Sequence, residues 1–167
     1  EKNFFIYIPE VESEDERFPV LYVLHGKWGD HEDWVGKANA REAAELYRMI
    51  LVFPDGNPFS WYLDSPLKED CQYQSYITKE LVPYIDDHYP TMPKREARGI
   101  MGLSMGGHGA LLMAAKNPDL FGSASSLSGI LKLTNHPYRE DVVERLGPWQ
   151  RNIERWEANS VYDQASR

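Results

Sequence analysis

The residues with the clearest chemical potential form the pentapeptide GLSMG at residues 102–106, in which Ser104 lies two residues from a glycine on each side. An apolar run over residues 98–103 leads into it and predicts a buried strand. The small, Ala- and Leu-rich residues 107–116 that follow predict a helix. A strand, a sharp turn and a helix expose a serine hydroxyl as a nucleophile. The chemistry indicated is acyl transfer at Ser104.

Steric crowding explains why this segment contains glycines. A serine at so tight a turn is usually strained, and side chains at Gly102 and Gly106 would collide with neighbouring backbone. The helix starting at Met105 directs free N–H groups and its positive dipole end toward a carbonyl oxygen that becomes negative. GxSxG also occurs in ordinary Gly-rich turns, but the flanks, with Gly107 and Gly109 allowing close helix packing, favour the nucleophile.

The elements that must position Ser104 alternate between strands and helices. Strands are predicted at residues 3–8, 18–24, 49–54, 98–103 and 121–127. Helices are predicted at residues 33–49, 69–88, 107–116, 139–146 and 150–158, with Pro83 expected to kink the second. This alternation predicts an α/β fold with a largely parallel sheet. Gly26 and Gly29 allow a sharp turn just past the second strand, where such sheets place their sites.

Composition narrows the class of protein. With 167 residues, 42% of them apolar, the chain is long enough for one packed domain. A net charge of −8 without a local Lys/Arg cluster argues against a nucleic-acid or anionic-membrane partner. The lone cysteine, Cys71, excludes an internal disulfide and a cysteine-rich metal site. No run reaches membrane-spanning length and no signal peptide opens the chain, which begins with Glu1 rather than Met.

An aromatic segment lies between Pro58 and Pro66 and contains Phe59, Trp61 and Tyr62. It has no helical or strand periodicity. Its aromatic residues fit a small core cluster and the wall of a pocket equally well.

Six strings carry a resemblance to a known family: LYVLHG, LVFPDGN, SWYLDSP, YITKELVPYID, GLSMGGHGALLMAAKNPDLF and SLSG. They run from about residue 20 to residue 130. The chain resembles the α/β-hydrolase esterases grouped around esterase D. These include S-formylglutathione hydrolases, tributyrin-type esterases and the family 1 carbohydrate esterases that remove feruloyl or acetyl groups from plant polysaccharides. The later strings RLGPW and ERWEANSVYD look closest to bacterial carbohydrate-esterase-like members.

The resemblance implies an α/β-hydrolase fold, with a mostly parallel central sheet and helices on both faces. It makes Ser104 the nucleophile and the backbone N–H of Met105 one oxyanion donor. The second donor would be the backbone N–H of Lys27, with Trp28 as a weaker choice. Trp28 and Trp61 would line the substrate pocket.

Other polar residues have structural roles under the same resemblance. Asp55 and Asp64 would shape loops, and His25 would line the oxyanion turn. As a catalytic base, His25 would precede the serine, against the order Ser, acid, His that is usual in this fold.

The general base is the part of the site that these residues do not supply. Only His108 and His136 follow Ser104. His108 is expected to pack near the site as a helix residue. His136 follows Asp119, but Asp119 ends the helix, which carries it about 1.5 Å per residue away from Ser104.

We therefore expect the catalytic acid and histidine to lie outside residues 1–167, since the family takes both from loops after later strands. The chain is expected to be a single α/β-hydrolase domain that lacks its C-terminal part. A further C-terminal segment or a second chain would then complete the site and cover the sheet edge. The alternative is a domain that has lost its base and folds differently at its end.

The favoured function is a serine carboxylesterase that forms an acyl-enzyme from a small-molecule or carbohydrate ester, without metal or cofactor. An acyltransferase of the same fold is one alternative. A non-catalytic module, with residues 59–62 as a sugar-stacking surface, is another. A glutathione thioester is less favoured, because no evident basic site awaits its carboxylates. A secreted or periplasmic location is favoured over the cytoplasm.

Overall fold

The computed structural model describes residues 2–36 and 39–165 and contains one sheet of 5 strands in the order β1-β3-β2-β4-β5. The strands are β1 (Phe4–Tyr7), β2 (Val20–Leu24), β3 (Ile50–Pro54), β4 (Arg98–Leu103) and β5 (Ser123–Leu127). Only β1 is antiparallel to its neighbour, β3. Leu24 pairs with Gly102 and Leu103 with Leu127, so β2, β4 and β5 end at one edge of the sheet.

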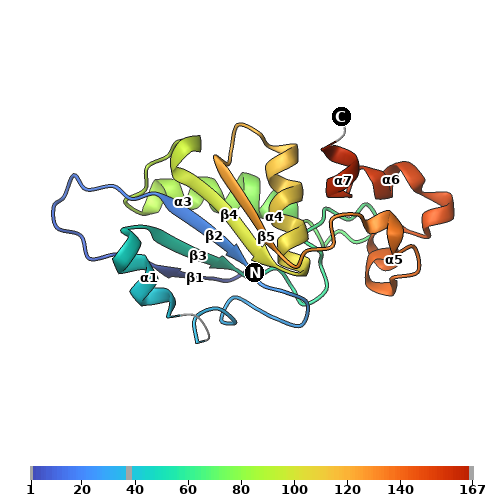
Figure 1. Ribbon diagram of the computed structural model, residues 1–167, viewed down its shortest axis with the longest axis horizontal. Coiled ribbons are helices and arrows are strands. Elements are labelled where there is room, and N and C mark those ends of the chain that lie inside the picture. Colours follow the sequence, from blue (N-terminus) through green and yellow to red (C-terminus); the bar gives the residue numbers. More distant parts are fainter. Residues whose placement is uncertain (1, 37–38, 166–167) are drawn as a thin grey trace.

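Helices cover both faces of this sheet and continue beyond its end (Figure 1). The helices are α1 (Ala40–Tyr47), α2 (Tyr73–Ser75), the π-helical η1 (Tyr76–Leu81), α3 (Val82–His88), α4 (Met105–Lys116), α5 (Glu140–Leu146), α6 (Ile153–Glu157) and α7 (Val161–Gln164). Short 3-10 turns are η2 (Arg95–Ala97), η3 (Leu133–Asn135) and η4 (Trp149–Arg151). In Figure 1, α5, α6 and α7 lie together beyond the end of β5. The predicted α/β-hydrolase architecture is confirmed.

Burial on both faces explains the continuous apolar strands. In β2, Tyr22 joins the larger core cluster, which includes α3 and α4, while Val23 joins the smaller cluster under α1. In β3, Val52 and Phe53 divide in the same way. Strands buried on both faces have no polar side to alternate with, so the runs at residues 18–24 and 49–54 predicted them correctly.

The helix predicted at residues 33–49 is shorter than expected. Helix α1 begins at Ala40, and residues 31–36 form turns, while residues 37–38 lie outside the described part of the chain. The indole N–H of Trp34 donates a hydrogen bond to the carbonyl of Leu24 at 3.4 Å. This segment is therefore held as a loop against the end of β2.

Two further helix predictions need correction. The helix predicted at residues 69–88 begins only at Tyr73, and the N–H of Val82 reaches the carbonyl of Ile77 in a π-helical turn just before Pro83. A wider turn accommodates the proline ring, which has no N–H and would crowd the carbonyl four residues earlier. The helix predicted at residues 150–158 is divided into η4 and α6, and α7 was not predicted.

Candidate active site

Ser104 lies between β4 and α4 with φ 53° and ψ −111°, a left-handed conformation that is strained for a residue with a side chain. Its N–H donates to the carbonyl of Leu127 at 2.7 Å, and its carbonyl accepts from the N–H of His108 at 3.0 Å. The residue is partly exposed. Ser104 therefore sits on a sharp corner at the carboxyl edge of the sheet and outside the core.

Two glycines make this corner possible. A Cβ added to Gly102 would meet the backbone of Gly106, and one added to Gly106 would meet the carbonyl oxygens of Leu24 and His25. The predicted steric need for glycine at both positions is confirmed. Because α4 begins at Met105, the first N–H groups of this helix have no partner within the helix. They can serve as donors to an oxygen beside Ser104.

The turn that follows β2 packs against this corner. A Cβ placed on Gly26 would lie 3.7 Å from the Cβ of Ser104. The N–H of Trp28 donates to the carbonyl of Pro58 at 3.1 Å, and the N–H of Gly29 to that of Gly26 at 3.1 Å. Because the Trp28 N–H is already engaged, it is not the oxyanion donor considered as a weaker choice. The backbone N–H of Lys27 remains the candidate oxyanion donor in this turn.

The side chain of His25 supports the same turn through hydrogen bonds. It is buried, with Nδ1 2.8 Å from the carbonyl oxygen of Gly26 and Nε2 2.8 Å from the backbone N of Gly56. The N–H at Nδ1 therefore donates, and Nε2 accepts from Gly56. Burial lowers the pKa of His25 and so favours the neutral ring, although the hydrogen bond to Gly26 acts in the opposite direction. Both ring nitrogens are thus used in joining loops.

A pocket of about 530 Å³ lies beside Lys27. It is lined by Lys27, Trp28, Phe59, Arg139, Glu140, Asp141, Glu144 and Arg145. The Trp28 side chain is 75% exposed and meets the ring of Phe59 edge-on, with 4.4 Å between ring centroids. Trp28 therefore stands at the surface of a pocket next to the oxyanion turn, as a substrate-lining residue would.

Trp61 has a different environment from Trp28. It is 1% exposed, within the larger core cluster, and its ring lies edge-on to His108 at 5.6 Å. Tyr62 is also fully buried, whereas Phe59 is only partly buried. The aromatic segment is thus divided, because Phe59 faces the pocket while Trp61 and Tyr62 fill the core. Trp61 does not line the open pocket.

Charged side chains converge on Asp141 at the start of α5. Its Oδ2 lies 2.9 Å from Lys27 Nζ, and its Oδ1 lies 3.3 Å from Arg139 Nε. Burial favours the neutral carboxyl, but the hydrogen bond from Lys27, the Trp61 side chain and the charge of Arg139 together outweigh it and lower the pKa of Asp141. Arg139 and Asp141 were not predicted as site residues, since no motif marks residues so far along the chain as neighbours of Lys27.

In the described part of the chain, the remaining histidines and aspartates considered from the sequence form no hydrogen bond with the Ser104 hydroxyl. His108 is fully buried, with Nδ1 2.8 Å from the carbonyl of Ile130, and burial lowers its pKa to about 4. His136 is exposed. Across residues 2–36 and 39–165, no hydrogen bond joins Ser104 Oγ to a histidine.

The two loop aspartates bind backbone or side-chain groups nearby. Asp55 accepts the N–H of Asn57 at 2.9 Å, and Asp64 accepts both the N–H and the hydroxyl of Ser75, at 2.9 and 2.7 Å. These contacts fit the loop-shaping roles expected for both. Asp119 lies beyond the C-terminal end of α4, opposite the end that carries Ser104.

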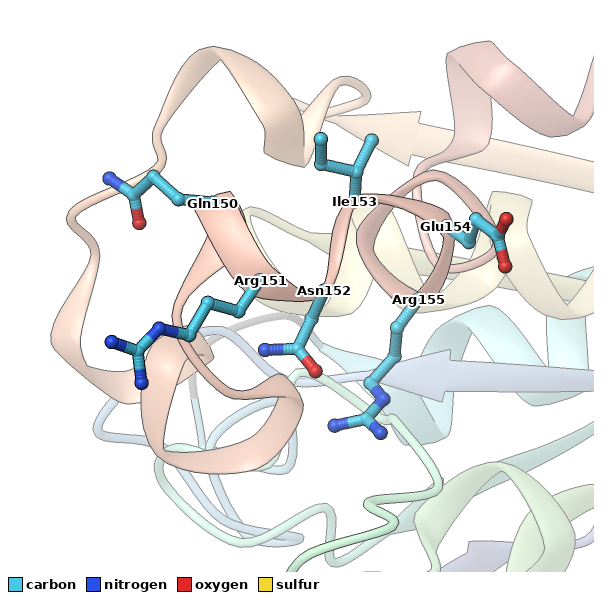
Figure 2. Close-up of a pocket in the computed structure, with 6 residues that line it drawn as sticks. All are labelled: Gln150, Arg151, Asn152, Ile153, Glu154 and Arg155. Carbon is cyan, nitrogen blue, oxygen red and sulfur yellow. The ribbon is translucent and has the colours of Figure 1, made fainter.

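A second concave region lies on the segment from η4 to α6. It is lined by Gln150, Arg151, Asn152, Ile153, Glu154 and Arg155, which are consecutive in the chain. Figure 2 shows Arg151, Asn152 and Arg155 extending toward the same side, with Ile153 pointing the other way. Asn152 and Arg155 donate to the carbonyls of Pro148 and Leu146. This region shares no lining residue with the pocket beside Lys27.

Within the part of the chain that the structure describes, no helix has the length and apolar character required to cross a membrane. The same part contains no group of three or more His, Cys, Asp or Glu side chains able to hold a metal ion.

Comparisons with known proteins agree with this geometry. S-formylglutathione hydrolase from Bos taurus is 32% identical over 146 residues, covering 75% of this chain and 51% of that protein. The solved S-formylglutathione hydrolase from Agrobacterium tumefaciens is 28% identical with a TM-score of 0.85, covering 98% of this chain and 64% of its own. A ferulic acid esterase structure, 24% identical, shares the fold with a TM-score of 0.79 and covers 98% of this chain and 64% of its own.

The chain thus spans between half and two thirds of the length of these relatives. All of residues 1–167 match the sequence model of the Esterase family, described as "Putative esterase". The chain therefore belongs to this esterase family.

Proposed function

We propose that this chain carries the nucleophile and the oxyanion donors of a serine carboxylesterase that works through an acyl-enzyme. The observation that carries the proposal is the placement of Ser104. It occupies a strained corner at the N-terminus of α4, and the turn containing Gly26 and Lys27 packs against it. This arrangement supports a site in which a hydroxyl lies near two sets of backbone N–H groups, as acyl transfer requires.

The reaction follows from these positions. Ser104 Oγ attacks the ester carbonyl carbon and gives up its proton to a general base, while the carbonyl oxygen becomes an oxyanion. The N–H groups of Met105 and Lys27 stabilise that oxyanion, and the loss of one such donor typically slows a reaction by about 10²–10³. The base returns the proton to the departing alcohol, and water then cleaves the acyl-enzyme by the same steps in the second half.

The base itself is proposed to come from residues outside this chain. His25 uses both ring nitrogens in loop contacts, and His108 is fully buried. The matched relatives are longer than this chain. A histidine and its carboxylate partner, from a further C-terminal segment or a second chain, would complete the site at the exposed side of Ser104.

The pocket between Trp28, Phe59 and α5 is proposed to hold the substrate. Its exposed aromatic rings offer an apolar surface for an aryl or sugar group. A small-molecule or carbohydrate ester, with feruloyl or acetyl as the acyl group, fits this surface.

A thioester of glutathione is a second candidate, favoured by one structural observation. Lys27 from the turn after β2 and Arg139 and Arg145 from the segment of α5 line the pocket, together with three acidic residues of α5, so cations from two distant segments gather beside the oxyanion turn. The sequence offered no such basic site for the carboxylates of glutathione. The bovine and Agrobacterium relatives, whose names carry this substrate, support the same candidate.

Hydrolysis of 4-nitrophenyl acetate by the intact protein tests the proposal. Ser104→Ala is expected to lower kcat/KM by at least about 10³-fold. Ser128→Ala is the matched control, because Ser128 also has φ 53° and directly follows β5. It is expected to stay within about threefold of wild type. Equal activity of Ser104→Ala and wild type would exclude the mechanism.

Competing substrates then separate the two candidates. S-formylglutathione and a feruloyl ester of a pentose are compared by kcat/KM, and the higher value identifies the substrate class. An added sugar acceptor, followed by product analysis, detects acyl transfer in place of hydrolysis.

A further inference from the structure

The two ends of Lys27 face different parts of the molecule. Its backbone directly follows Gly26, which packs against Ser104. Its side chain extends to α5, where Nζ lies 2.9 Å from Asp141 Oδ2. The Lys27 side chain is 29% exposed and that of Asp141 9%. This ion pair is therefore partly shielded from water and salt, in contrast to an ordinary surface pair.

Asp141 is itself a fixed anchor. Its Oδ1 lies 3.3 Å from Arg139 Nε and accepts the N–H of Val142 at 3.1 Å. Its carbonyl accepts from Arg145 Nη1 at 2.7 Å. Because both its carboxylate and its backbone are held, Asp141 can transmit the position of α5 to Lys27.

The turn that Lys27 belongs to needs such support. Trp28 has φ 71°, a left-handed conformation that a residue with a side chain adopts only when its surroundings enforce it. The backbone hydrogen bonds from Trp28 to Pro58 and from Gly29 to Gly26 hold the turn on its C-terminal side. The ion pair from Lys27 adds a constraint at the residue whose N–H is the proposed donor.

We propose that Asp141 is a positioning residue, which fixes the Lys27 backbone N–H for the developing oxyanion through the Lys27 ion pair. The proposal rests on the esterase function proposed above. Oxyanion donors act only within a narrow range of positions, so a small displacement of this turn lowers kcat without removing any donor.

The test compares variants in the intact protein. Lys27→Met and Asp141→Asn remove the ion pair but keep every backbone N–H. The matched control is Lys68→Met, because Lys68 Nζ lies 3.0 Å from Glu144 Oε2 and also ties α5 to a loop, yet does not touch the oxyanion turn. Lys27→Arg keeps the positive charge and serves as the conservative variant.

The expected result is a fall in kcat of about tenfold for Lys27→Met and for Asp141→Asn, with KM within about threefold. The double variant should be no slower than the slower single variant, since both changes break one interaction. Lys27→Arg should retain most of kcat, and Lys68→Met should match wild type. Affinity for a trifluoromethyl ketone, which forms a tetrahedral oxyanion adduct, should fall in parallel with kcat.

Other outcomes would overturn the inference. An unchanged kcat in either single variant would remove the positioning role, and additive losses in the double variant would show two separate roles. A loss confined to KM would make Lys27 a substrate contact. An equal loss in Lys68→Met would show a general effect of loosening α5. Melting temperatures identify a variant that does not fold, and the other variant of the pair Lys27→Met and Asp141→Asn then gives the decision.

The proposed esterase function is tested independently of the positioning role of Asp141. It fails if Ser104→Ala remains active, whatever Asp141 does. If Ser104→Ala is inactive and Asp141→Asn is fully active, only the positioning role is lost.

Discussion

His25 accepts a hydrogen bond at Nε2 from the backbone N–H of Gly56, 2.8 Å away. This contact joins the turn after β2 to the turn after β3. Because the Nδ1 side of the same ring bonds to Gly26, one buried histidine sets the spacing of two loops at the carboxyl edge of the sheet.

His25→Leu is expected to destabilise the protein by about 1–3 kcal/mol, because it leaves the Gly56 N–H buried without an acceptor. Urea unfolding of the intact protein measures this change. His88→Leu is the control, since His88 is exposed, and it should stay within about 0.5 kcal/mol of wild type. Equal stability of His25→Leu and wild type would contradict the role of this contact.

Gly106→Ala is expected to destabilise the protein by about 3 kcal/mol or more and to abolish esterase activity. Its added Cβ would collide with the carbonyl oxygens of Leu24 and His25, which are backbone atoms and cannot rotate away. Gly36→Ala is the control, because nothing lies within 4 Å of a Cβ at that position. Thermal melts and ester hydrolysis report both effects, and similar values for the two variants would refute the steric argument.

The parts of the fold that depend on interactions between residues close in sequence were predicted correctly. The apolar run at residues 98–103 became β4, and the GLSMG turn has the strained serine and the crowded glycines expected of it. The start of α1 was wrong, because Trp34 is held by a tertiary hydrogen bond to Leu24. Periodicity cannot reveal such a contact.

The pocket was less predictable than the corner that holds Ser104. Trp28 and Trp61 are the same residue type in aromatic loops, yet one is 75% exposed and the other 1%. The partnership of Lys27 with Asp141 joins distant segments, and no spacing rule connects them. Side-chain placement across loops depends on the completed fold.

Stability is expected to fall as pH drops below about 6.5 because of His108. Burial lowers its pKa to about 4, so the unfolded chain binds a proton between pH 6.5 and pH 4 that the folded protein does not. Unfolding is thereby favoured as pH decreases through this range, by about 2 kcal/mol at pH 5 from this group alone.

Urea unfolding at pH 7.5 and pH 5.0 checks this prediction. His108→Gln should lose less stability between the two pH values than wild type, since glutamine does not titrate. The same loss in both proteins would show that His108 does not govern the pH dependence.

Trp28→Ala is expected to raise KM for aryl esters by about tenfold, corresponding to about 1.4 kcal/mol of lost contact with the exposed indole. Its effect on kcat should be small. Tyr47→Ala removes another exposed aromatic side chain, 64% exposed at the end of α1, and should leave KM unchanged. Steady-state kinetics with 4-nitrophenyl esters gives both values, and an unaltered KM in Trp28→Ala would place the substrate elsewhere.

The most direct test of the central claim is covalent labelling of the intact protein by a fluorophosphonate, followed by mass spectrometry of the labelled peptide. We expect a single phosphonylated residue, Ser104, and no labelling of Ser104→Ala. Labelling at another serine, or none at Ser104 in an enzyme that hydrolyses esters, would contradict that claim.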